Sequence, residues 1–175
     1  MQQNILISGT GGQGIIASGE FLSEALFMND FEVMFSRSYG ASARGGACMS
    51  RIMVADHVIN DLQFMQSDVL LCLSLPAFKK YMPLARPDSL IIVDTHVQNR
   101  AEDIREDLEI VQVPARDIAV GLGNQIVANM VMLGALAKHS EMVYLDLLKD
   151  AVNTNMRESM REINLKALQM GYDSV

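Results

Sequence analysis

The 175-residue sequence predicts an α/β fold: a three-layer Rossmann-like sandwich with a mainly parallel sheet, one β-hairpin and a helical C-terminal third. Three observations lead to this prediction. Continuous apolar runs, which are typical of buried parallel strands, alternate with helical patterns. A glycine-rich turn joins the first apolar run to the first helical pattern. No linker or internal repeat divides the chain, so we expect a single domain over residues 1–175.

The pattern places each element in turn. Strands are expected at Ile5–Ile7, Glu32–Phe35, Val69–Leu73, Leu90–Val93 and Ile110–Val113, with a hairpin of Cys48–Val54 and His57–Asn60 around Ala55-Asp56. Helices are expected at Gly14–Met28, Ala77–Met82, Glu102–Asp107 and Asn124–His139, and over residues 144–170 up to a cap at Gly171. Gly134, inside the fourth of these helices, predicts close packing against a neighbour.

The first turn carries the strongest signal. Gly9, Gly11 and Gly14 have G-x-G-x-x-G spacing, with Gly12 and Gln13 inside it. We expect a positive φ at Gly9, an accessible backbone at Gly11, and close packing of helix on strand at Gly14. The helix that follows presents free N–H groups and a partial positive charge to an anion. Three interpretations stay open: a dinucleotide site, a turn that only closes the first βα unit, and a loop that serves a phosphate or a partner subunit.

Two features disfavour nucleotide chemistry. A dinucleotide site needs an acidic residue at the end of the second strand, but that strand ends in Ser36-Arg37. Arg37 suits a 2′-phosphate, yet no other residue favours NADP. The glycine loop also lacks the G-K-[S/T] sequence of a P-loop, so ATP hydrolysis is not expected.

A second glycine-rich stretch covers residues 38–46. In it Arg44 stands directly before Gly45 and Gly46, where a guanidinium can bind a carboxylate or a phosphate with two hydrogen bonds. Because the strands are mainly parallel, residues 36–46 should lie at the same sheet edge as residues 8–14, 74–76 and 94–96. We therefore expect a ligand or interface site there, against the alternative of a solvated loop arginine. Its candidate residues are Gly9, Gly11, Gly12, Gln13, Gly14, Tyr39, Arg44, Gly45 and Gly46.

Composition excludes several functions. The net charge of −7 argues against general nucleic-acid binding, and no apolar run is long enough to span a membrane. No signal peptide is evident, so we expect a cytoplasmic protein. Thirteen methionines predict either adaptable core packing or a buried subunit interface.

The reactive residue types form no obvious set. Cys48 and Cys72 are isolated in apolar stretches, which predicts buried free thiols and no iron–sulfur cluster in this chain. Of the three histidines, only His96 is expected at the functional edge, beside Asp94. We therefore expect no catalytic residue and no metal site in this chain.

The combined motifs resemble the gamma subunit of the 2-oxoacid:ferredoxin oxidoreductases, whose members act on pyruvate, 2-oxoglutarate or ketoisovalerate. The resemblance rests on Gly9-Thr-Gly-Gly-Gln-Gly14, then Tyr39-Gly40 and Arg44-Gly45-Gly46, and on Asn129 to Gly134, which matches an N-x-x-x-L-G pattern in a late helix. It covers essentially the whole chain. Ala41-Ser42-Ala43 departs from the more acidic or proline-containing middle of the second motif.

The resemblance implies a non-catalytic subunit of an assembly that oxidatively decarboxylates a 2-oxoacid to an acyl-CoA and reduces ferredoxin or a similar acceptor. It implies alpha, beta and ferredoxin-like delta subunits as partners. In that family thiamine diphosphate sits on alpha and beta, and iron–sulfur clusters sit on beta and delta. The methionine-rich composition predicts that the chain associates with these subunits, or with itself as a homodimer when isolated.

The substrate stays open at this point. We favour 2-oxoglutarate, but indolepyruvate-type beta subunits share the same domain. We also expect the glycine loop and Arg44 either to face the route of the CoA phosphates or only to pack subunits together. The alternative function is a stand-alone nucleotide-binding or reductase domain of Rossmann type.

Overall fold

The computed structural model describes residues 1–39, 46–101 and 104–175. A six-stranded sheet has the order β2-β3-β1-β4-β5-β6, and β3 runs antiparallel to the other strands. The strands are β1 (Gln2–Thr10), β2 (Glu32–Ser38), β3 (Ala47–Ala55), β4 (Ser67–Cys72), β5 (Ala85–Asp94) and β6 (Glu109–Val113). The helices are α1 (Ile15–Phe27), α2 (Leu75–Tyr81), α3 (Thr95–Gln98), α4 (Ala115–Gly121), α5 (Ala128–His139), α6 (Leu145–Asn155) and α7 (Glu158–Asp173), with 3-10 turns η1 (Met82–Leu84) and η2 (Gln125–Val127).

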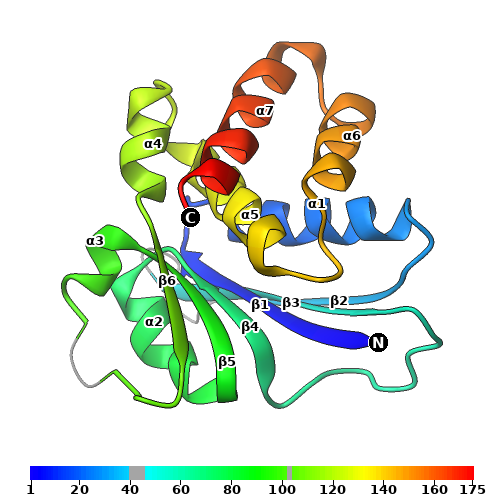
Figure 1. Cartoon of the computed structure of the whole chain (residues 1–175), viewed down its shortest axis with the longest axis vertical. Helices are drawn as coiled ribbons and strands as arrows, with labels where there is room; N and C mark the ends of the chain where they lie inside the picture. Colours follow the sequence, from blue (N-terminus) through cyan, green and yellow to red (C-terminus); the bar gives the residue numbers. More distant parts are fainter. Residues whose placement is uncertain (40–45, 102–103) are drawn as a thin grey trace.

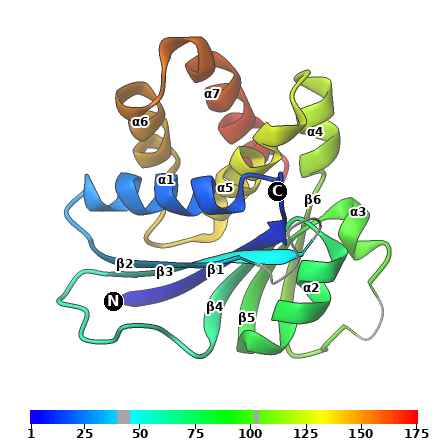
Figure 2. The same cartoon turned by 180° about the vertical axis from the view of Figure 1, so that it is seen from behind.

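Helices cover both faces of the sheet. Figures 1 and 2 show α1 and α5 against one face, with α6 and α7 stacked outside them, and α2 and α3 against the other face. The predicted three-layer sandwich is therefore confirmed, with α6 and α7 as an additional outer pair. Within the described residues, no helix has the length and apolar character needed to cross a membrane.

Burial on both faces explains the continuous apolar runs. Successive residues of a strand point to opposite faces, so Ile5 and Ile7 join the core under α1 and α5 while Leu6 joins the core over α2. All three side chains are at most 1% exposed. The strands predicted at residues 69–73, 90–93 and 110–113 are confirmed as β4, β5 and β6.

The predicted hairpin is misplaced. Residues 57–60 form no strand, because β3 already pairs with β1 on one side and with β2 on the other. The antiparallel pair is instead formed by the consecutive strands β2 and β3, with Glu32 opposite Ala55. This places β3 between β2 and β1 and makes the sheet mixed.

Three predictions in the helical segments are wrong. Residues 144–170 are not one helix: the backbone is extended at Met156 and Arg157 (ψ of 149° and 142°), which separates α6 from α7. Gly171 is not a cap, because α7 continues to Asp173. Residues 104–107 form no helix, and residues 102 and 103 lie outside the described residues. The helix expected from Asn124 is confirmed, and the Asn124 side chain accepts a hydrogen bond of 3.0 Å from Ile126 N.

Candidate functional site

Residues 11–14 form the turn between β1 and α1. Gly12 and Gly14 have φ angles of 93° and 70°, in the left-handed region that favours glycine. The positive φ expected at Gly9 is wrong, because Gly9 still belongs to β1. Gly9 is needed for space: a Cβ there would lie 2.6 Å from both Gln13 Oε1 and Ile15 Cδ1.

The Gln13 side chain holds this turn against the sheet. Its Oε1 accepts a hydrogen bond of 2.8 Å from Thr10 N, and its Nε2 donates one of 2.9 Å to Leu73 O, just after β4. Both ends of the amide are thus engaged within the protein. Gly11, in contrast, is exposed, and a Cβ there would meet nothing within 4 Å. The main chain of the turn is therefore open to approach at Gly11.

Gly14 contacts α5 and not the sheet, in contrast to the sequence expectation. Asn129 Nδ2 donates a hydrogen bond of 3.2 Å to Gly14 O, and a Cβ on Gly14 would lie 2.5 Å from that nitrogen. Gly19 is the glycine that brings α1 close to the sheet, since a Cβ there would lie 2.4 Å from Ser50 of β3. Asn129 begins the N-x-x-x-L-G pattern, so this late motif contacts the glycine turn.

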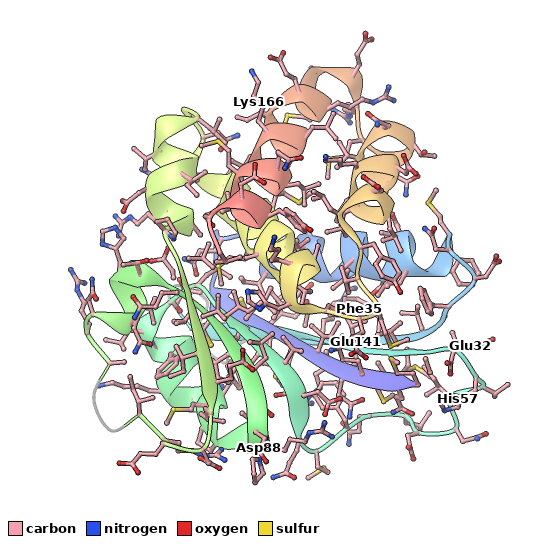
Figure 3. The ribbon with its side chains drawn as sticks, in the orientation of Figure 1. Glu32, Phe35, His57, Asp88, Glu141 and Lys166 are labelled. Atoms are coloured by element: carbon pink, nitrogen blue, oxygen red, sulfur yellow. The ribbon has the colours of Figure 1, made fainter. Side chains whose placement is uncertain are left out.

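A cavity of about 480 Å³ opens where β1, β4 and β5 end. Gly12 and Gln13 line it, as do residues 74–76 and the segment that begins with Asp94 and His96. Three of the four segments expected at this sheet edge therefore border one cavity, as the rule for parallel sheets requires. Figure 3 labels His57 and Asp88, which lie at the opposite end of the sheet from α3.

Asp94 fixes one wall of the cavity. Its carboxylate is 4% exposed, and its two oxygens accept hydrogen bonds of 2.9 Å from His96 N and Arg116 N. The carboxylate thus joins the end of β5 to the first turn of α4. The His96 ring in turn lies with Nε2 2.8 Å from Asp117 Oδ1. This arrangement holds Arg116 beside the glycine turn.

Arg100 and Arg116 line the cavity, and the sequence analysis missed both. Arg116 was detectable, because it follows Val113 at the end of β6 and so lies at the same sheet edge. Arg100 carries no such signal, since it follows the short helix α3 in a loop. Two guanidinium groups beside the glycine turn that precedes α1 make this cavity suited to anionic groups.

The second glycine-rich stretch is only partly described. Tyr39 is 66% exposed, with the Arg37 guanidinium carbon 5.9 Å from the centre of its ring. Gly46 directly precedes β3, and neither residue is part of the cavity wall. Arg44 and Gly45 lie outside the described residues, so their part in the site stays a prediction.

The sheet order disfavours the dinucleotide interpretation. The strands beside β1 are β3 and β4, so the end of β2 is separated from the glycine turn by a full strand. Arg37, near that end, forms an ion pair with Glu20 of α1. No acidic side chain at the end of β2 can therefore reach a ribose bound at the turn.

The two cysteines are buried on opposite faces of the sheet. Cys48 belongs to the core under α1, and Cys72 belongs to the core over α2. Burial raises the pKa of both thiols, and it raises the pKa of Cys72 to about 12. The hydrogen bond between Ser8 Oγ and Cys72 Sγ lowers the Cys72 pKa, but burial outweighs it. These thiols cannot ligate one cluster together. In residues 1–39, 46–101 and 104–175, no three His, Cys, Asp or Glu side chains gather in a metal-binding arrangement.

The fold and this cavity define an α/β domain whose glycine turn and arginines face one sheet edge. Residues 4–174 match the profile of the family described as pyruvate ferredoxin/flavodoxin oxidoreductase. The 2-oxoglutarate synthase subunit KorC of Methanocaldococcus jannaschii is 33% identical in an alignment of 175 positions that covers 99% of this chain and 94% of that protein. KorC of Archaeoglobus fulgidus is 33% identical over 172 residues, covering 97% and 86% of the two chains.

Solved structures agree with this relationship. The gamma subunit of a keto/oxoacid ferredoxin oxidoreductase from Geobacter sulfurreducens PCA superposes with a TM-score of 0.87 at 30% identity, over 99% of this chain and 96% of that chain. A 2-oxoglutarate:ferredoxin oxidoreductase from Magnetococcus marinus shares the fold, with a TM-score of 0.89 at 23% identity over 98% of this chain and 30% of that chain. The chain belongs to the pyruvate ferredoxin/flavodoxin oxidoreductase family and is a gamma-type subunit of a 2-oxoacid:ferredoxin oxidoreductase.

Proposed function

We propose that this chain is the gamma subunit of a cytoplasmic, thiamine-dependent enzyme that oxidises 2-oxoglutarate. The substrate assignment rests on how the relatives rank by sequence identity to this chain. Four KorC subunits of 2-oxoglutarate synthases are 32–33% identical to this chain. Subunits of indolepyruvate oxidoreductases are 22–25% identical, and one of a ketoisovalerate oxidoreductase is 26% identical.

The proposed reaction converts 2-oxoglutarate, CoA and two oxidised ferredoxins into succinyl-CoA, CO₂, one proton and two reduced ferredoxins. In this proposal alpha and beta subunits hold thiamine diphosphate, and beta and ferredoxin-like delta subunits hold the iron–sulfur clusters. The opposite placement of Cys48 and Cys72 supports this division of labour, because a cluster needs thiolates that converge.

Within this assembly, the cavity at the sheet edge is proposed to receive phosphate groups of CoA. Support comes from Arg100 and Arg116 in its wall, from the left-handed turn at Gly12, and from the N-terminus of α1. The relative from Magnetococcus marinus has CoA and succinyl-CoA bound. The alternative, that Gly11 and Arg44 only pack against the other subunits, predicts a loss of assembly instead of a loss of CoA affinity.

The proposal is tested by co-purifying the chain with candidate alpha, beta and delta subunits encoded beside it. The complex should reduce a low-potential acceptor with 2-oxoglutarate and CoA, and much more slowly with pyruvate, ketoisovalerate or indolepyruvate. Preference for another oxoacid would reject the substrate assignment. A chain that stays a monomer and binds none of these subunits would reject the proposal as a whole.

Arg116→Ala separates CoA binding from assembly. Loss of a charge-assisted hydrogen bond of about 1.5–3 kcal/mol should raise the KM for CoA roughly ten- to a hundredfold, with the oxoacid KM unchanged. Arg44→Ala is expected to act in the same way if that residue also meets CoA. The matched control is Lys166→Ala at the position on α7 that Figure 3 labels. This change removes an exposed cation that pairs with Glu162. Dissociation of the Arg44→Ala complex on a sizing column would favour the packing role.

A further inference from the structure

One face of the sheet carries an arginine among apolar side chains. Arg51 belongs to β3, is half-buried, and lies opposite Leu6 of β1 and Ser36 of β2. Its neighbours on the same face, two positions away along β3, are Met49 and Met53, which belong to the core over α2. A charged side chain is rarely placed among apolar neighbours on a central strand unless a partner compensates its charge.

Arg51 has no such partner within the part of the chain that the structure describes. None of the carboxylates there forms an ion pair with it, and its Nε atom is buried without a hydrogen bond. Only this nitrogen of the side chain is both buried and unpaired, so the two terminal nitrogens reach the surface. The guanidinium carbon lies 5.8 Å from the centre of the Phe64 ring, which supports the group on one side. Arg51 therefore presents a positioned cation whose terminal N–H groups are available to an acceptor.

The segment that supports this cation is apolar at the surface. Phe64 belongs to residues 56–66, which join β3 to β4 without forming a helix or a strand. Figures 1 and 2 show this segment on the same side of the sheet as α2 and away from that helix. Phe64 itself is buried, but Val58, Leu62 and Met65 are 67%, 81% and 76% exposed. Exposed apolar side chains gathered in one segment are typical of a contact with another protein.

We propose that Arg51 and residues 58–65 form a docking surface for another subunit of the oxidoreductase, whose contacting segment carries an Asp or Glu flanked by apolar side chains. The carboxylate accepts hydrogen bonds from the terminal nitrogens of Arg51, and its apolar neighbours cover Leu62 and Met65. Charge complementarity selects this occupant, because a partner without the carboxylate would bury an unpaired cation. The inference rests on the proposed function, since it needs the assembly with other subunits. It concerns a different surface from the CoA cavity, whose wall contains none of these residues.

Two substitutions test the charge. The natural chain, Arg51→Met and Arg51→Glu are each co-purified with the alpha, beta and delta subunits, and the complexes are diluted in series to measure the Kd for release of this chain. Arg51→Met keeps an apolar stem and should raise the Kd about a hundredfold, because the partner's carboxylate is left buried and unpaired. Arg51→Glu should raise the Kd further by charge repulsion. The matched control is Lys166→Met, which removes an exposed cation of α7 on the other side of the sheet and should leave the Kd unchanged.

The isolated chain separates docking from folding. Arg51→Met should unfold at the natural Tm or above it, because the substitution removes a buried nitrogen that has no partner. Leu62→Ser changes a side chain that the fold leaves exposed, so it should raise the Kd about tenfold with an unchanged Tm. This second variant keeps the inference testable if Arg51→Glu does not fold.

The outcomes distinguish this inference from the proposed function. A complex that is active on its oxoacid, with the same Kd for the natural chain, Arg51→Met and Leu62→Ser, would overturn the docking surface and leave the proposed function standing. Equal Kd values for Arg51→Met and Arg51→Glu would show that the partner group is not a carboxylate, which also overturns the inference. A lower Tm of Arg51→Met with an unchanged Kd would assign Arg51 to the fold of this chain alone. A natural chain that binds none of the subunits would instead reject the proposed function, and the inference with it.

Discussion

Gly134 of α5 and Gly171 of α7 each lie against the main chain of the other helix. A Cβ on Gly134 would lie 2.0 Å from Leu168 O, and a Cβ on Gly171 would lie 1.9 Å from Val131 O. Both neighbours are backbone atoms, which cannot rotate away. The two glycines therefore set how closely α5 and α7 approach. Because α5 also carries Asn129, this helix crossing supports the element that holds the glycine turn.

Gly134→Ala should destabilise the chain more than a typical helix substitution. The added methyl group must push the two helices apart, and overpacking of this kind costs about 1–3 kcal/mol or more. For a chain of this length, each 1 kcal/mol lowers the Tm by about 2–4 °C. Thermal unfolding followed by circular dichroism measures the change. Gly121→Ala is the control, because a Cβ there meets nothing within 4 Å and should leave the Tm unchanged or slightly raised.

The sequence correctly predicted the elements whose apolar pattern matches the way they pack in the fold. The apolar runs of β4 and β5 are buried on both faces, and the apolar side chains of β6 at the sheet edge are at least partly buried, so the apolar runs identify all three strands. The sheet edge followed from their parallel order, and with it the segments around Gln13, Ser74 and Asp94 that line the cavity. Gly134 was read correctly because a glycine inside an apolar helix requires a close neighbour.

The failures have a common physical origin in contacts between distant parts of the chain. Val152, Met156 and Met160 keep a four-residue spacing across the break between α6 and α7, so the pattern alone shows one helix. The hairpin failed because β3 pairs on both sides, which its own sequence does not encode. Arg116 was missed although it follows the predicted strand that ends at Val113, because α4 was not predicted and the sheet edge after that strand was not considered.

Gly14→Ala should lower the stability of the chain, whereas Gly11→Ala should leave it unchanged and tests access to the turn. Gly14 has a φ of 70° and no room for a Cβ beside Asn129, so its substitution should cost about 1–3 kcal/mol of unfolding free energy. Gly11 has open space, so Gly11→Ala should unfold like the natural chain in urea. If a ligand or subunit approaches the turn there, Gly11→Ala should still raise the KM for CoA or weaken assembly. A Gly11→Ala complex with normal assembly and kinetics would rule out close approach at that residue.

Cys72 makes the stability of the chain depend on alkaline pH. Its pKa is raised from an ordinary value of 9.0 to about 12, because the buried thiolate is disfavoured. The stabilisation by the neutral buried thiol is thus complete below pH 9 and is lost as the pH rises toward 12, with a slope of at most about 1.4 kcal/mol per pH unit. Urea unfolding at several pH values should show this loss in the natural chain and a smaller loss in Cys72→Ala. Identical slopes in the two proteins would contradict the assignment.

Asp94→Asn tests whether the buried carboxylate positions Arg116. An asparagine has one acceptor oxygen, so its NH₂ group would face either His96 N or Arg116 N, both of which now donate to the carboxylate at 2.9 Å. One hydrogen bond is lost and a buried donor is left unpaired, which should cost about 1–3 kcal/mol of stability in urea unfolding. If Arg116 meets CoA, the KM for CoA should rise while the oxoacid KM stays constant. Asp88→Asn is the matched control: Asp88 is exposed, with a φ of 61° that asparagine tolerates, so stability should change by less than about 0.5 kcal/mol. A destabilised Asp94→Asn complex with an unchanged CoA KM would limit Asp94 to a structural role and separate Arg116 from CoA.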